Sequence, residues 1–102
     1  MATYSVSHSA LDKVLSGTTA DTVNVDADDA AGNERFLVVY NVAGTAPLYV
    51  RSDGTTAVAS ADGTTPVYPG MFEVFDFTNM GDKSLSIVGN GNTYSVVGTN
   101  GN

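Results

Sequence analysis

The only histidine, His8, is the first candidate for a catalytic residue. A serine hydrolase would need His8 to be oriented by an acid and to lie beside a serine on a sharp turn. The sequence contains no Gly-x-Ser-x-Gly, and His8 lies in the segment with the least regular pattern of the chain. We therefore interpret His8 as a surface or interface histidine and not as a catalytic base.

An acidic stretch in the first half of the chain is the best candidate for a metal site. Residues 26–33 read Asp-Ala-Asp-Asp-Ala-Ala-Gly-Asn, and calcium is commonly bound by several carboxylates of one loop. The spacing lacks the glycine at the sixth position and the glutamate at the twelfth that an EF-hand loop requires. The pattern therefore favours a solvated loop. The acidic cluster consists of Asp26, Asp28 and Asp29 in this stretch and Glu34 directly after it.

The remaining candidate groups also lack the spacing that chemistry needs. A glycosidase holds two carboxyl groups ~5–9.5 Å apart across a cleft, whereas Glu73 and Asp76 would point to opposite faces of a regular strand. Residues 89–92, Gly-Asn-Gly-Asn, have neither the lysine nor the following helix of a phosphate-binding loop. The chain has no cysteine for a disulfide or a thiolate metal site. The sequence thus predicts no enzymatic activity, no cofactor and no metal.

Length and charge narrow the classes of partner. The 102 residues suffice for one domain with a single core. The net charge of −7 comes from eleven acidic and four scattered basic residues, so we expect no nucleic-acid partner and no binding to an anionic membrane. The longest apolar run, residues 36–40, is far shorter than the ~20 residues of a membrane helix. Residues 1–15 show no signal-peptide pattern.

Alternation of apolar and polar residues predicts short strands along most of the chain. Strands are predicted at residues 21–26, 35–42, 48–51, 57–59, 71–77, 84–87 and 93–97. Residues 35–42 do not alternate, which indicates a central strand with both faces covered. Short turns predict that residues 35–42 form an antiparallel hairpin with residues 48–51. The Gly-Asn-Gly-Asn turn predicts a second hairpin, between residues 84–87 and 93–97.

This spacing of strands predicts an all-β fold. We expect a single antiparallel β-sandwich of about seven to eight short strands, either jelly-roll or immunoglobulin-like. The predicted sandwich domain spans residues 21–98, between an N-terminal arm at residues 1–20 and a flexible tail at residues 99–102. In the arm, Tyr4 and Val6 alternate as in a strand, whereas the apolar residues between Ala10 and Leu15 have helical spacing. We expect an extended arm with at most one helical turn, docked on a neighbouring chain.

Two identical turns predict the surface that meets a partner. The sequence Asp-Gly-Thr-Thr occurs twice, and Asp-Gly favours a turn because glycine accepts positive φ. Two turns so close together, followed by two prolines, predict a projecting lobe over residues 52–70. Tyrosines mostly pack within sheets, but those bordering the lobe could stack on a sugar or meet a protein. The candidate contacts of lobe and arm are Tyr4, His8, Tyr49, Arg51, Asp53, Asp62 and Tyr68.

The order of these features resembles a known group of proteins. An N-terminal Ala-Thr-Tyr-Ser-Val-Ser-His precedes a Thr/Val strand at residues 21–25, and a strand ending in Asn41 leads to a glycine-containing turn. Leu-Tyr-Val-Arg-Ser-Asp-Gly-Thr, a second Asp-Gly turn, Val-Tyr-Pro-Gly and a last strand around Tyr94 follow. Over residues 2–97 this is similar to the small β-sandwich capsid decoration (cement) proteins of tailed bacteriophages, especially those that infect actinobacteria.

The resemblance implies a structural role. Proteins of this kind bind the outer face of the major capsid protein, often as clusters at symmetry axes, and stabilise the phage head. The resemblance therefore implies that the partner is a major capsid protein. It also implies a homo-oligomer on the capsid surface and a location on the outside of the virion. The alternative function is a tail, head-fibre or baseplate module that recognises host surface carbohydrate through Tyr49, Tyr68 and the Asp-Gly turns. No catalytic residues carry over from the resemblance.

Overall fold

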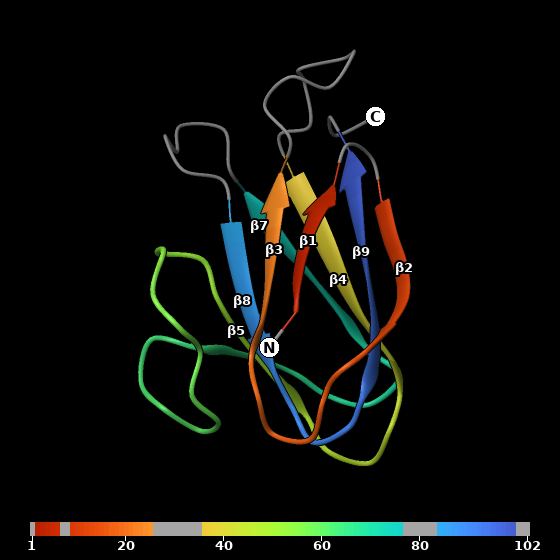
Figure 1. Cartoon of the computed structure of the whole chain (residues 1–102), viewed down its shortest axis with the longest axis vertical. Helices are drawn as coiled ribbons and strands as arrows, with labels where there is room; N and C mark the ends of the chain where they lie inside the picture. The colour runs from red at the N-terminus through yellow and green to blue at the C-terminus, as the bar shows by residue number, and fades with distance from the viewer. Residues whose placement is uncertain (1, 7–8, 26–35, 77–83, 100–102) are drawn as a thin grey trace.

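The computed structural model describes residues 2–6, 9–25, 36–76 and 84–99, which form a β-sandwich of nine strands in two sheets (Figure 1). The strands are β1 (Thr3–Val6), β2 (Ser9–Val14), β3 (Asp21–Val25), β4 (Phe36–Ala43), β5 (Leu48–Arg51), β6 (Thr65–Val67), β7 (Phe72–Asp76), β8 (Ser84–Val88) and β9 (Thr93–Thr99). The prediction of an all-β sandwich is confirmed. Within the described part of the chain, no helix is long and apolar enough to cross a membrane.

The strand order is that of a jelly roll. One sheet has five strands in the order β1-β3-β8-β5-β6, and the other has four in the order β2-β9-β4-β7. From β2 onward the pairings are nested, because β2 pairs with β9, β3 with β8, β4 with β7, and β5 with β6, all antiparallel. This is the arrangement of one long antiparallel hairpin rolled into a sandwich, which decides between the two predicted types. β1 is added outside the roll and runs parallel to β3, so the sandwich is not purely antiparallel.

Both predicted hairpins are wrong. β4 lies in the four-stranded sheet and β5 in the five-stranded sheet, and β8 and β9 are divided in the same way. Each short turn instead carries the chain from one sheet to the other, at the lower end of the molecule in Figure 1. A short turn is compatible with either outcome. The outcome is decided by distant pairing partners, such as β7 and β9 for β4, which local sequence does not identify.

The predicted N-terminal arm is extended, but it belongs to the sandwich. β1 pairs with β3, and β2 pairs with β9 through a bulge between Ala10 and Lys13, where Asp12 has a φ of 53°. The extra residue of the bulge changes which side chains face inward, so Ala10 and Leu15 are both buried in the core. This interruption of the alternation produced the apparent helical spacing. The predicted tail consists of Thr99, which ends β9, and residues outside the described part of the chain.

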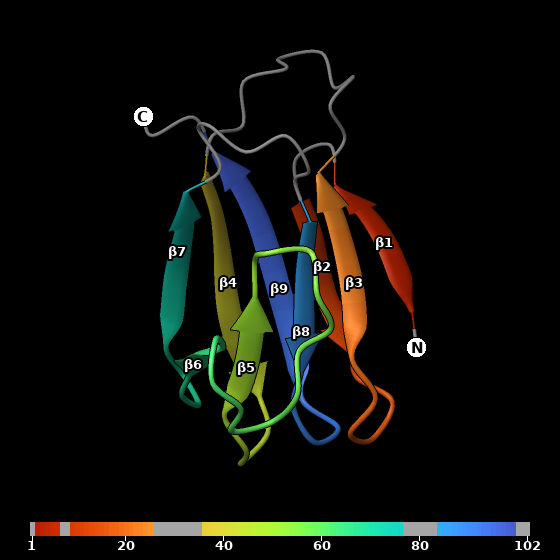
Figure 2. The ribbon, with the colours of Figure 1, turned by 90° about the vertical axis from the view of Figure 1, so that its left-hand side faces the viewer.

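The predicted edge strand at residues 57–59 is also wrong. The edge strand is β6, which pairs with β5 alone and contains Pro66. Proline is tolerated at that position because an edge strand can leave one side of its backbone without ladder hydrogen bonds. Residues 52–64, which connect β5 to β6, instead fold over the outer face of the five-stranded sheet (Figure 2).

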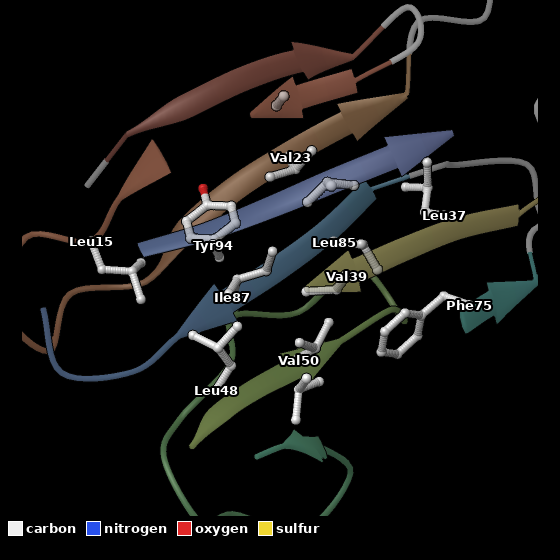
Figure 3. Close-up of a cluster of buried hydrophobic side chains, with 13 residues drawn as sticks. Leu15, Val23, Leu37, Val39, Leu48, Val50, Phe75, Leu85, Ile87 and Tyr94 are labelled. Carbon is white, nitrogen blue, oxygen red and sulfur yellow. The ribbon is translucent and has the colours of Figure 1, made fainter. Parts of the chain in front are cut away.

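The core lies between the two sheets and is built from both (Figure 3). Tyr94 is fully buried there, and its hydroxyl donates to Oδ2 of the buried Asp21 at 2.9 Å. Burial and this hydrogen bond raise the pKa of the Tyr94 phenol well above its usual range. Oδ1 of Asp21 accepts from the backbone N–H of Ala2 at 3.1 Å, which ties the start of the chain to the roll. Each large apolar side chain buried in this core contributes about 1.5–3 kcal/mol.

Candidate interaction surface

The outer face of the five-stranded sheet is covered over β8 by the chain itself. Ala57 is 3% exposed and packs with Ala20 and Val88 in a small second cluster. Its backbone N–H donates to Oγ of Ser86 on β8 at 2.8 Å. Figure 2 shows residues 52–64 crossing in front of this sheet. The predicted lobe is therefore anchored on its own sandwich through its middle, and its two Asp-Gly turns flank that anchor.

Arg51 joins the two Asp-Gly turns. Its Nε and Nη2 donate to the two carboxylate oxygens of Asp53 at 3.1 and 2.6 Å. Its Nη1 donates to the backbone carbonyl oxygen of Asp62 at 3.2 Å. The structure thus brings three of the predicted contact residues together, but it uses their polar groups to hold the loop in shape.

The charge state of Asp53 reflects this clamp. Hydrogen bonds from Arg51, and then from the hydroxyl and backbone N–H of Thr55, hold the pKa of the Asp53 carboxyl well below its usual range. The same pairing raises the pKa of Arg51. Both side chains remain partly exposed, so water and salt weaken the attraction between them. The clamp orders the loop and adds little to global stability.

A recess between the loop and the sheet is too small for an ordinary ligand. It has a volume of about 50 Å³ and is lined mainly by hydroxyl groups, including those of Thr22, Thr55 and Ser84. Binding pockets for small molecules usually measure ~300–1,000 Å³. The recess can hold water, and it offers no space for a sugar ring.

The outer face of the four-stranded sheet is apolar and exposed over β4 and β7. Val38 and Tyr40 on β4 lie in register with Val74 and Phe72 on β7, so the four side chains share one face of the sheet. Tyr40 is 39% exposed, Val74 47% and Phe72 57%, and Val38 is partly exposed. We call these four residues the β4–β7 face. Leu37, Val39 and Phe75 alternate with them and are buried in the core.

Tyr40 and Phe72 form an aromatic pair on this face. The ring centroids of Tyr40 and Phe72 lie 5.6 Å apart with an interplanar angle of 39°. Tilted aromatic pairs at this separation attract each other beyond the effect of their buried area. The two rings therefore support each other on paired strands.

Buried Asn41 fixes the loop end of the same face. Its backbone N–H donates to the carbonyl oxygen of Met71 at 3.0 Å, and its own carbonyl oxygen accepts from Gly70 at 3.1 Å. These bonds hold the turn at residues 68–71 beside the end of β4. Met71 and Tyr68 are each 59% exposed on this turn, and Val42 is exposed at the end of β4. They extend the apolar surface at the border of the β4–β7 face.

The other predicted contact residues are dispersed. The Tyr4 ring packs against the core, with Lys13 Nζ 4.7 Å from its centroid. Tyr49 is half-buried, and its hydroxyl accepts from Ser60 at 3.1 Å. Tyr68 is exposed, but on the turn that borders the β4–β7 face. His8 lies outside the described residues.

Prediction from sequence missed the β4–β7 face, although one signal pointed to it. Residues 36–40, Phe-Leu-Val-Val-Tyr, indicated a strand with both faces covered. The chain covers only the face that carries Leu37 and Val39. A strand that is apolar on both faces but packs against the core on only one of them leaves such a surface exposed.

No metal site emerges from the described residues, which contain no group of three or more potential ligands. The acidic stretch at residues 26–34 lies outside them. Glu73 and Asp76 are both exposed and lie in register with Val39 and Phe36, so they belong to opposite faces of the sheet.

No protein-family model, no curated protein and no solved structure matches this chain.

Proposed function

We propose that this chain is a structural protein of a phage head that decorates the capsid, binding the outer face of the major capsid protein and stabilising the shell. The observation that carries the proposal is the β4–β7 face. An ordered, half-exposed apolar surface on paired strands is suited to being covered by protein. This supports a function that consists of binding another protein surface.

Fold and charge agree with such a role. Jelly rolls occur among viral capsid domains, and also among lectins and cupins, so the fold alone does not select the function. Among these classes of protein, the resemblance of residues 2–97 to phage capsid decoration proteins favours a capsid protein. A net charge of −7 is repelled by packaged DNA, which favours a position on the outside of a head.

Stabilisation would follow from linkage. A protein that binds the assembled shell and not its free subunits shifts the equilibrium towards the shell. At a free concentration 100 times the dissociation constant, each bound copy contributes about 2.7 kcal/mol. Many weak contacts on one particle add to a large resistance against heat and internal pressure.

The test uses heads from a phage that lacks this gene. Purified protein is added back, and we measure the copies bound per head and the temperature at which the DNA is released. We expect saturable binding on the outer surface and a higher release temperature. Binding restricted to the tail, or absence of binding to heads, would contradict the proposal.

A matched pair of variants tests whether the β4–β7 face is needed for binding to heads, directly or through association of copies. Phe72→Ser changes an exposed residue of the β4–β7 face, whereas Val58→Ser changes an equally exposed apolar residue on the loop over the other sheet. If the face is required on the head, Phe72→Ser lowers the number of copies bound and Val58→Ser does not.

The alternative, a carbohydrate-binding module, is supported by exposed Tyr68, whose ring could stack on a sugar. Tyr49 supports it less, because that residue is half-buried and bonded to Ser60. Binding on a glycan array that Tyr68→Ala abolishes would favour this alternative over the capsid.

A further inference from the structure

We infer that the β4–β7 face packs against the same face of a second copy, so that the chain forms a two-fold symmetric dimer. The inference takes from the proposed function only the premise that protein covers this face. It adds that the covering protein is a second copy of this chain, and that the outward side chains of β4 and β7 make the contact.

The first argument compares the outward sides of β8 and β4, one strand from each sheet. β8 is central in the five-stranded sheet, and its outward residues Ser86 and Val88 are covered by the chain's own loop, leaving them 8% and 3% exposed. β4 is as apolar on its outward side, yet no described segment covers it. Sheets stack face to face at ~10 Å when both contacting surfaces are apolar and ordered. A second β4–β7 face meets both conditions.

The size of the surface fits a dimer. Half-exposed aromatic and valine side chains give the β4–β7 face and its bordering turn on the order of 500 Å² of apolar area. A standard interface buries ~800 Å² on each partner, of which ~56–65% is apolar. The face and its bordering turn together are therefore about as large as the apolar part of one side of such an interface. Leu11 and Val14, on the other side of β9 at the far edge of the same sheet, are also exposed.

Charge also favours a second copy. Two chains of −7 charge repel each other, so they associate best through surfaces without charge. All four side chains of the β4–β7 face are uncharged. On β7, Glu73 belongs to the opposite side of the strand, whereas Asp76 shares the outward side and lies at the end of the strand far from Phe72. Because these four side chains carry no charge, they give no electrostatic preference for a basic partner, and shape and apolar area select the partner.

The contact uses the face of the sheet and not the free edge of β7. In an antiparallel β7–β7 pairing centred on Val74, Glu73 of each copy would lie opposite Phe75 of the other. Charged side chains at such positions are a common protection against edge-to-edge pairing. In a face-to-face dimer, the same patch serves both copies, as a two-fold interface requires.

Sedimentation equilibrium of the purified full chain tests the inference. We expect a dimer. Its dissociation constant should rise by no more than about twofold between 0.15 and 1 M NaCl, because apolar contacts are not screened by salt. Phe72→Asp should weaken dimerisation by about 100-fold or more, since it places a charge inside the apolar contact. Val58→Asp is the matched control and should leave the dimer intact. Circular dichroism and urea unfolding confirm that both variants fold.

Cross-linking supplies a second readout that does not depend on a disruptive variant. The chain has no cysteine, so a single introduced thiol is unique. A short bis-maleimide should link Val42→Cys into covalent dimers, because Val42 is exposed at the border of the face, and should not link Val58→Cys. Equal yields for the two variants would overturn the inference.

The outcomes separate this inference from the proposed function. A monomer at all concentrations up to about 0.5 mM, far above the micromolar range of typical specific interfaces, overturns the dimer and leaves capsid binding open. A dimer that does not bind heads supports the inference and contradicts the proposed function.

Discussion

The side chains of Asn41 and Asn92 hydrogen-bond to each other in the buried end of the roll, where Nδ2 of Asn92 lies 3.1 Å from Oδ1 of Asn41. Both amides also donate to the carbonyl oxygen of Ala46, at 3.1 and 2.8 Å. Asn41 belongs to β4, and Asn92 to the turn between β8 and β9. This pair therefore ties together the two turns that cross between the sheets, and it supports the strand that carries Tyr40.

Asn41→Ala should destabilise the fold by about 1–3 kcal/mol, because it leaves buried carbonyl oxygens without their donors. One of these is the carbonyl of Val67, which accepts from Asn41 at 3.0 Å. Urea unfolding followed by tyrosine fluorescence measures the change. Asn90→Ala, which removes an exposed side chain of the same type, should stay within about 0.5 kcal/mol of the original chain. Equal losses in the two variants would contradict the role assigned to the buried amides.

Gly44→Ala should destabilise the fold more than Gly54→Ala. Both glycines have positive φ, 123° and 87°, so both substitutions introduce backbone strain. A Cβ on Gly44 would also lie 2.6 Å from Nδ2 of Asn92, whereas one on Gly54 would meet no atom within 4 Å. We expect Gly54→Ala to cost about 1–2 kcal/mol and Gly44→Ala at least about 1 kcal/mol more. Similar unfolding midpoints in urea would show that the turn adapts.

Tyr94→Phe should change how stability depends on alkaline pH. The pKa of Tyr94 is raised in the folded state, so its contribution is complete below the unfolded pKa of ~10 and is lost as the pH rises above it. The free energy of unfolding should therefore fall by up to about 1.4 kcal/mol per pH unit from this group above pH ~10. Tyr94→Phe removes this component and also costs about 1.5–3 kcal/mol at pH 8, through the lost bond to Asp21. Urea titrations between pH 8 and 11 compare the two slopes, and parallel slopes would argue against the burial of this phenol.

Asp53→Asn should reduce the loss of stability at acid pH. The folded pKa of Asp53 is lowered, so its contribution is present above the unfolded pKa of ~3.9 and is lost as the pH falls below that value. The original chain and the variant should therefore differ slightly in melting temperature at pH 7, and the difference should narrow as the pH falls below ~3.9 towards the lowered pKa of the folded state. Asp62→Asn is the control, because Arg51 contacts the backbone of Asp62 and not its carboxylate. A control that changes as much as Asp53→Asn would show that net charge, and not the clamp, sets the pH response.

The sequence predicted the class of fold because most strands bury one face. Val23, Val50 and Leu85 each alternate with polar or half-exposed neighbours, and this pattern depends only on the two-residue period of a strand. The pairing of strands could not be predicted in this way. A turn such as residues 89–92 has the composition of a hairpin turn, but its role is set by Asn92 and by the β4–β5 turn, far away in the sequence.

The candidate surface was only partly predictable for a related reason. The double turn at Asp53 and Asp62 was recognisable, yet its attachment through Ala57 to Ser86 depends on a backbone hydrogen bond that no composition encodes. The run at residues 36–40 indicated two covered faces, and the missing cover became visible only when β4 was placed in the four-stranded sheet. Exposure of Phe72 and Val74 depends on the same placement.

The nested pairing also sets an order in which the chain can fold. β5 and β6 form the innermost pair, and every later pairing from β4–β7 to β2–β9 closes a longer loop around them. Loop closure costs more entropy as the loop lengthens, so folding should begin at β5–β6 and proceed outward. The Arg51 clamp lies on this first pair, whereas Asp21 and Tyr94 act where the roll closes last. Weakening the clamp should therefore slow refolding, and weakening the Asp21–Tyr94 bond should mainly accelerate unfolding.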